Sequence, residues 1–145
     1  MATGVSFHFP AVTFIFKHRA LTKEWLVSVA KCERYRCREL RIIFVDDETL
    51  YEMNKSFLNH HTYTDIITFD LKETDAKEVV GELYISADRV KENAVKFGVS
   101  FRTELDRVMV HGLLHLLGYK DKSKDDQTVM RKLEDKYLKR RTWPI

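Results

Sequence analysis

Apolar and polar residues alternate in several stretches of the first two thirds of the chain, a pattern typical of β-strands. The first alternation begins at Val5 and ends before Pro10, but 12–16 repeats it, so the limits of the first strand stay open. The acidic connection 72–78 is hairpin-like, so the strands on either side of it need no crossover helix between them. The predicted strands are 5–9, Leu40–Val45, Asp65–Phe69 and Gly81–Ile85.

Apolar residues recur at helical spacing in the remaining stretches. Residues suited to helix N-caps precede three of these stretches, at Asp46, Ser86 and Ser100, and glycines suited to helix ends follow two, at Gly98 and Gly118. The predicted helices cover about 21–29, 47–57, 87–97, 101–117 and 125–138, with Phe97 on the apolar stripe of the third and Met130, Leu133 and Tyr137 facing inward in the last.

This order of elements predicts an α+β fold in which one domain spans residues 1–145. About four strands form one mixed sheet, and about five helices pack against it. The helix after Ser100 is apolar on most sides, because Phe101, Leu105, Val108, Met109, Leu113 and Leu116 nearly surround it. We therefore expect this helix to be central and largely buried.

Composition is that of an ordinary globular protein, with 145 residues, 44% hydrophobic and 32% charged. No apolar run approaches the roughly 18 residues of a membrane span. The first residues lack a basic leader followed by an apolar block, so we expect no signal peptide, no membrane partner and a cytoplasmic location. In that setting Cys32 and Cys37 are expected to be ordinary thiols rather than a disulfide.

Basic residues are clustered although the net charge is only +3. Segment 31–41 contains five of them and segment 131–141 contains six, ending in Lys139, Arg140 and Arg141. Such clusters bind phosphates in a salt-dependent way. Acidic residues are interspersed in both segments, so solvated helix faces explain the same pattern.

The strongest candidate for chemistry is the segment from His111 to Asp121. His111 and His115 are four residues apart and would therefore project from one face of a helix. A turn at Gly118 would bring the carboxylate of Asp121 back towards them. Two histidines and one carboxylate with a fourth position open form a ligand set of catalytic zinc.

Other interpretations of the two histidines remain open. His-x-x-x-His occurs often by chance, and both residues would then be ordinary core or surface histidines. In zinc proteases of the His-Glu-x-x-His type a glutamate beside the first histidine is the general base. Gly112 occupies that position, so the sequence disfavours peptidase chemistry of this type.

Three blocks together resemble the YbeY family of bacterial metal-dependent single-strand endoribonucleases. The family pattern His-Gly-x-Leu-His-Leu-x-Gly-Tyr is matched by 111–119, its Thr-Asp-Val-Leu-Ser-Phe block resembles 64–69, and 81–86 resembles a third block. Glu104 stands seven residues before His111, as in the family. The resemblance extends from about Leu40 to Leu138.

This resemblance implies a zinc-dependent endoribonuclease acting on single-stranded RNA in 16S rRNA maturation and ribosome quality control. One Zn²⁺ per chain would be held by His111, His115 and Asp121, and the RNA or the ribosome would be the partner. The residue that accepts the proton is open. Asp65 and Glu104 are candidates, although the sequence places neither near the metal, and a turn or cap role is the slightly favoured explanation of Asp65.

Two positions depart from the family pattern. Asp121 replaces a third histidine, after Lys120 in place of an aspartate, and Leu58 occupies the position of an arginine thought to serve RNA processing. An aspartate is an established zinc ligand, and its harder oxygen would change the metal preference. His60 and His61 follow Leu58 closely. Three interpretations of them are open: contacts to phosphate, an alternative metal ligand, or loop residues without a role.

Two further functions stay open. The departures at Leu58 and Asp121 favour a non-catalytic ribosome-associated factor whose metal is structural or absent. The other is a metal-dependent hydrolase of peptides or small molecules, which Gly112 disfavours. The sequence does not indicate an oligomeric state.

Overall fold

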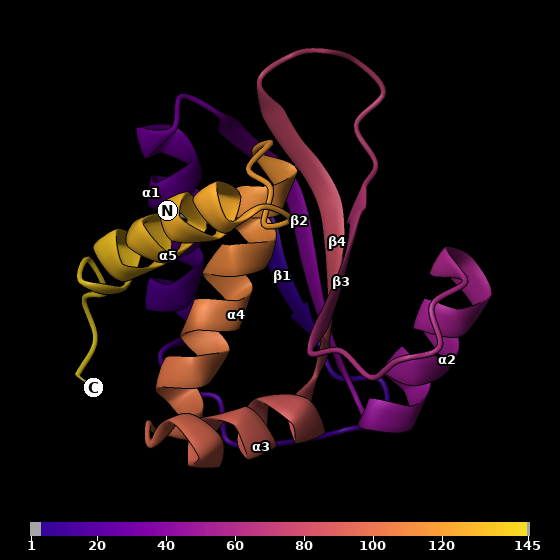
Figure 1. The fold of residues 1–145 in the computed structure, drawn as a ribbon. Coiled ribbons are helices and arrows are strands. Elements are labelled where there is room, and N and C mark those ends of the chain that lie inside the picture. The colour runs from indigo at the N-terminus through magenta and orange to yellow at the C-terminus, as the bar shows by residue number, and fades with distance from the viewer. Residues whose placement is uncertain (1–3, 145) are drawn as a thin grey trace.

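The computed structural model describes residues 4–144, which form a mixed four-stranded sheet and five helices (Figure 1). In chain order the elements are β1 (Val5–His8), α1 (Arg19–Cys32), β2 (Arg36–Val45), α2 (Asp47–Leu58), β3 (Ile66–Asp70), β4 (Glu78–Ser86), α3 (Ala87–Phe97), α4 (Phe101–Leu116) and α5 (Lys124–Leu138).

The sheet has the order β1-β2-β4-β3. β1, β2 and β4 are parallel, whereas β3 pairs antiparallel with β4. The hairpin expected around the acidic connection 72–78 is thus confirmed, and so are the mixed sheet and the α+β fold.

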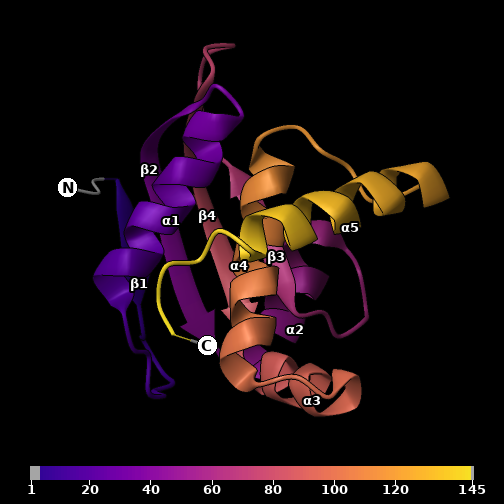
Figure 2. The same cartoon turned by 90° about the vertical axis from the view of Figure 1, so that its left-hand side faces the viewer.

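Helices cover the two faces of the sheet unequally. α1 and α4 pack on one face, while α2 packs on the other (Figures 1 and 2). The main core lies between the sheet and the layer formed by α1 and α4. Side chains of β2 alternate between the two faces, as expected of a strand. Leu40, Ile42 and Phe44 face the main core, whereas Ile43 and Val45 face a smaller cluster with Leu50 and Ile67.

α4 is the central helix, as its sequence predicted, and it contacts α1, α3, α5, β3 and β4. Glycines allow this close approach. A Cβ on Gly112 of α4 would lie 2.6 Å from Cδ1 of Ile66, and one on Gly81 of β4 would lie 2.9 Å from Cδ1 of Leu116. Larger residues at either position would push α4 away from the sheet.

The structure resolves one open point of the sequence and corrects one local prediction. The alternation at 12–16, which left the limits of the first strand open, does not form a strand, because Phe14 and Phe16 instead pack their rings against Phe44, at centroid distances of 5.0 and 5.7 Å. Phe97, predicted on the buried stripe of α3, is 56% exposed at the end of that helix. Among the described residues, no helix combines the length and apolarity needed to cross a membrane.

Candidate metal centre

The end of α4 is shaped as the sequence predicted. Gly118 adopts a left-handed conformation with φ of 102°. Its N–H donates to the carbonyl of His115 at 3.0 Å, and the N–H of Tyr119 donates to that of Leu114 at 3.1 Å. These two bonds form a Schellman motif, which ends the helix and reverses the chain. The reversal carries the following segment back along the face of α4 that holds the histidines.

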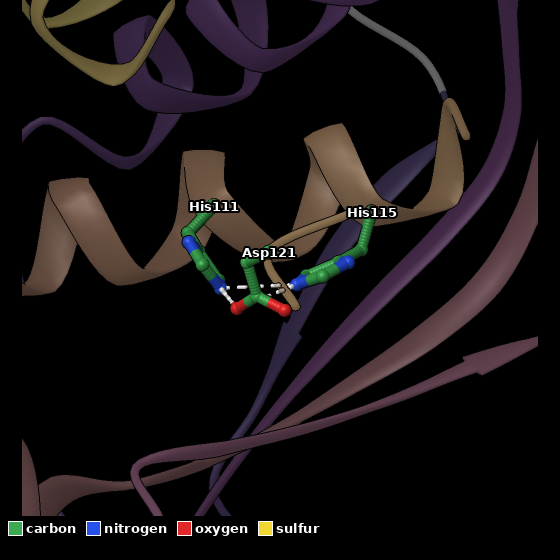
Figure 3. Close-up of side chains that lie close together, drawn as sticks. All are labelled: His111, His115 and Asp121. Carbon is green, nitrogen blue, oxygen red and sulfur yellow. Dashed lines mark hydrogen bonds and ion pairs between the residues drawn. The ribbon is translucent and has the colours of Figure 1, made fainter. Parts of the chain in front are cut away.

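His111, His115 and Asp121 converge at this reversal (Figure 3). The Nε2 atoms of the two histidines are 3.1 Å apart. Oδ2 of Asp121 lies 3.3 Å from Nε2 of His111 and 3.4 Å from Nε2 of His115. The three atoms therefore form a nearly equilateral triangle at the surface of α4.

The triangle matches the ligand spacing of a tetrahedral zinc site. With zinc–ligand bonds of about 2.0–2.1 Å, tetrahedral ligand atoms lie roughly 3.3 Å from one another. Two imidazole nitrogens and a carboxylate oxygen are also donors that zinc accepts. All three side chains are partly exposed, so a fourth position can be reached from solvent. The residues present thus fit zinc in chemistry, spacing and access.

The segment between α4 and α5 holds Asp121 in place. The side-chain amide of Gln127 donates to the backbone carbonyl of Asp121 at 3.1 Å. α5 begins with a capping box in which Ser123 accepts from the backbone N–H of Asp126, and the Asp126 carboxylate accepts from that of Ser123. The position of Asp121 is therefore set by the start of α5 as well as by the end of α4.

Glu134 of α5 fixes the orientation of His111. Its Oε2 lies 2.6 Å from Nδ1 of His111, and its Oε1 accepts from Nη1 of Arg107 at 2.8 Å. Because Nδ1 of His111 meets a carboxylate, that nitrogen is the one that carries hydrogen, and Nε2 is left to face Asp121 and His115. A carboxylate behind a histidine is a common support of metal-binding imidazoles.

The charges of this pair stabilise one another. Burial acts to raise the pKa of Glu134, but the hydrogen bonds from His111 and Arg107 outweigh it and hold that pKa below its ordinary value. Burial acts to lower the pKa of His111, but the neighbouring Glu134, Asp121 and Asp65 raise it above its ordinary value. A raised pKa in His111 means that a metal ion must compete with a proton there.

Both candidate proton acceptors lie beside this group. Asp65 and Glu104 line a pocket of about 250 Å³ together with His111, Arg107 and Glu134. Burial raises the pKa of Asp65. Burial, together with repulsion from Asp65, raises that of Glu104. The backbone carbonyl of Asp65 also accepts from the N–H of Ser86, so this residue has a structural contact as well.

Other residues singled out from the sequence lie elsewhere. Leu58 ends α2, and His60 and His61 are exposed in the loop that follows. Within residues 4–144, the single group of potential ligands is the one at His111, His115 and Asp121, so His60 and His61 do not join it. Gly112 packs against the sheet, which explains why the residue after His111 carries no general base.

Sequence reasoning missed Glu134 as a member of the site. In the sequence it is one of the acidic residues interspersed in the basic segment 131–141. A signal was present, because Glu134 shares a helical stripe with Met130 and Tyr137, and both of these are buried. A carboxylate on a buried stripe requires a partner. The identity of that partner depends on how α5 crosses α4, which the local pattern does not contain.

Comparison with known proteins supports a single family. The family model described as "Endoribonuclease YbeY" matches residues 12–142. A protein of that name from Cytophaga hutchinsonii is 48% identical over 122 residues, covering 84% of this chain and 85% of its own length. One from Flavobacterium psychrophilum is 44% identical over 135 residues, covering 93% and 94%.

A solved structure gives the same result for the fold. The solution structure of TM1509 from Thermotoga maritima superposes with a TM-score of 0.62 at 29% sequence identity. The match covers 93% of this chain and 87% of that one. Most of the described fold therefore falls within the compared region.

Proposed function

The chain belongs to the YbeY family of endoribonucleases, and we propose that it is a zinc-dependent hydrolase that cleaves single-stranded RNA. Its relatives are named endoribonucleases, which indicates that this protein is a nuclease and therefore a hydrolase. The proposed substrate is ribosomal RNA, in 16S rRNA maturation and ribosome quality control. Such a role carries with it a cytoplasmic site of action.

One observation supports zinc dependence most directly: the triangle of ligand atoms from His111, His115 and Asp121, all within 4.8 Å of one another. Surface histidines that share a helix face by chance do not need a buried carboxylate to orient their rings. Here Glu134 holds His111 at 2.6 Å, so Nε2 of that imidazole points at the other two ligand atoms. Zinc bound there would supply a water of lowered pKa and would polarise a phosphoryl oxygen.

The other steps are assigned to the chain's own side chains. Asp65 and Glu104 line the pocket next to His111, and burial raises the pKa of both carboxyls, which favours a role in accepting and returning a proton. Arg107 pairs with Oε1 of Glu134, the oxygen that does not contact His111. His111 and His115 keep their orientation because α4 is packed on most of its surface.

The test is cleavage of a single-stranded RNA by purified protein, with metal content measured on the same sample. We expect about one zinc per chain, loss of cleavage on chelation and recovery when zinc is restored. His111→Ala and His115→Ala should each abolish stoichiometric zinc and cleavage. His60→Ala and His61→Ala are the matched controls, since these residues lie outside the ligand group.

The alternatives predict different results. Stoichiometric metal without RNA cleavage would favour a non-catalytic ribosome-associated factor. Zinc-dependent hydrolysis of peptides or small esters, with RNA left intact, would favour a hydrolase of another class. A full equivalent of zinc in His111→Ala or His115→Ala would show that the ligands lie elsewhere.

A further inference from the structure

A groove runs from the ligand triangle along α5. It has a volume of about 730 Å³ and is bounded by His111 and Asp121 at one side. Lys124, Arg131 and Lys132 contribute its cationic side chains, and all three come from α5. The groove is thus continuous with the candidate metal centre and carries positive charge on one helix.

Arg131 occupies a special place in this arrangement. It lines both the large groove and the pocket of about 250 Å³ that contains Asp65 and Glu104. Its side chain is 63% exposed, and its ion pair with Glu134 is long, at 3.8 Å. Arg107 already satisfies the same carboxylate oxygen at 2.8 Å. The guanidinium of Arg131 can therefore turn to an anionic ligand without leaving a buried charge unpaired.

Helical geometry places the cations along a line. Lys124 and Arg131 are seven residues apart, about two turns and roughly 10.5 Å along the axis, so they share one face of α5. Thr128 lies between them and also lines the groove. The Thr128 hydroxyl donates to the carbonyl of Lys124 at 3.0 Å, so the cationic side chains are the groups left to meet a ligand. A row of cations beside a metal centre suits an extended chain of phosphates, which offers charges at regular intervals.

The basic cluster at the other end of α5 has a different arrangement. Arg141 donates to the buried carboxylate of Asp106 at 2.9 Å, and its side chain is only 11% exposed. Arg140 contacts the Cys32 sulfur and lies over the Tyr137 ring. None of residues 139–141 lines the groove at the ligand triangle. In the sequence, segment 131–141 forms one basic cluster. In the structure, Arg131 and Lys132 line the groove, whereas residues 139–141 do not.

From these contacts we infer that the groove along the first half of α5 binds the phosphate backbone of the substrate strand, with Lys124 and Arg131 as its principal contacts. The inference rests on the proposed function, because it takes RNA to be the substrate. The carboxylates of Asp121 and Glu134 lower the positive charge of the groove, and a bound dication offsets them. Zinc and RNA therefore bind with positive coupling, each raising the affinity for the other.

The test measures binding of a labelled, cleavage-resistant analogue of single-stranded RNA to the zinc-loaded protein by fluorescence anisotropy, with gels confirming that the analogue stays intact and a separate assay measuring cleavage of unmodified RNA. Lys124→Gln and Lys139→Gln are a matched pair, because each removes one lysine charge from an end of α5. Lys124→Gln and Arg131→Gln should each weaken binding about tenfold. Each should also lower the salt dependence by about 0.7 in slope. Lys139→Gln should bind as the wild type does, and all variants should keep one zinc.

The results separate the inference from the proposed function. If the wild type binds and cleaves RNA while Lys124→Gln and Arg131→Gln match Lys139→Gln, the groove assignment is overturned and the endoribonuclease proposal stands. Equal RNA affinity with and without zinc would overturn the coupling. If the zinc-loaded wild type neither binds nor cleaves single-stranded RNA, the proposed function fails, and the groove assignment fails with it.

Discussion

Asp106 and Glu134 are both buried carboxylates that join α4 to the C-terminal part of the chain, yet their surroundings differ. Asp106 on α4 is fully buried and accepts from Arg102 at 2.8 Å and from Arg141 at 2.9 Å. Glu134 on α5 is 5% exposed and meets Arg107 and His111. Each carboxylate therefore has two close basic partners, and Glu134 also has a longer ion pair with Arg131, at 3.8 Å.

The network around Asp106 is closed. Arg102 also donates to the Lys17 carbonyl and the Thr22 hydroxyl, and its guanidinium lies over the rings of Phe16 and Trp143, at 4.6 and 4.8 Å. These contacts tie the segment after α5 and the segment before α1 to α4. The donors of Arg102 are used within the protein, which suits a structural role.

The network around Glu134 ends in an open triangle. On the side of His111 that faces away from Glu134, its Nε2 meets Nε2 of His115 and Oδ2 of Asp121. These three atoms lie within hydrogen-bonding distance of one another at a partly exposed surface. An imidazole can donate a hydrogen bond within the triangle only if its Nε2 carries hydrogen. That nitrogen then has no lone pair for a metal, and a ring whose Nδ1 also carries hydrogen is charged. Burial of a carboxylate does not by itself distinguish structure from function. What distinguishes these two is whether the chain of contacts closes on the protein or ends at solvent.

The largest effect on stability should come from Asp106→Ala. This change leaves the charges of Arg102 and Arg141 uncompensated in a buried site, which costs about 3–5 kcal/mol of unfolding free energy. Chemical denaturation measures the loss, and zinc content per folded chain should remain at one. A loss below about 1 kcal/mol would show that the closed network contributes little to stability.

Asp121→Ala should have the largest effect on zinc among variants that still fold. It removes one of three ligands, so affinity should fall by more than the roughly 100-fold that loss of an outer contact can cause. Asp121→His should retain tight binding and shift the preference towards nitrogen-preferring metals. Competition with a chromogenic chelator measures both. Unchanged affinity in Asp121→Ala would move the third ligand to another residue.

Glu134→Gln should weaken zinc binding by about 10- to 100-fold, because the His111 ring loses the carboxylate that orients it. Asp135→Asn is the matched control. Asp135 also pairs with Arg107, at 2.8 Å, but it has no contact with His111. The control should keep wild-type zinc affinity. Equal losses in both variants would mean that Arg107, rather than His111, transmits the effect.

The sequence predicted the parts of the site that depend on local geometry. His111 and His115 share a helix face by spacing, and Gly118 ends the helix because it tolerates a positive φ. The approach of Asp121 to the histidines follows from that turn. The same local reasoning placed most strands and helices, because the alternation and the caps are local signals too.

Contacts between distant elements could not be predicted in this way. Glu134 meets His111 only because α5 crosses α4, and Arg141 meets Asp106 for the same reason. At 12–16 an alternating pattern arose from aromatic residues that pack as a loop over Phe44. In each case the deciding interaction is tertiary, and the one-dimensional pattern fits more than one outcome.

The smallest effect is the pH dependence that separates the two networks. In the metal-free protein, the lowered pKa of Glu134 adds stability that is lost as pH falls through that pKa. The raised pKa of His111 adds stability that is present below about 6.5 and lost as pH rises through the raised value. The pair thus stabilises the metal-free protein most in mildly acidic solution.

Zinc has the opposite pH dependence at the upper end of this pH range. It binds the neutral imidazole, so its binding strengthens as His111 loses its proton. Zinc affinity should rise by less than about tenfold per pH unit while His111 still holds its proton, and then level off. Glu134→Gln removes the carboxylate that raises the pKa of His111, so levelling should begin at lower pH. NMR titration of the His111 ring measures its pKa, and zinc titrations at several pH values measure the zinc affinity. An unchanged midpoint in Glu134→Gln would mean that Glu134 does not control the charge of His111, and the contrast with Asp106 would then rest on solvent access alone.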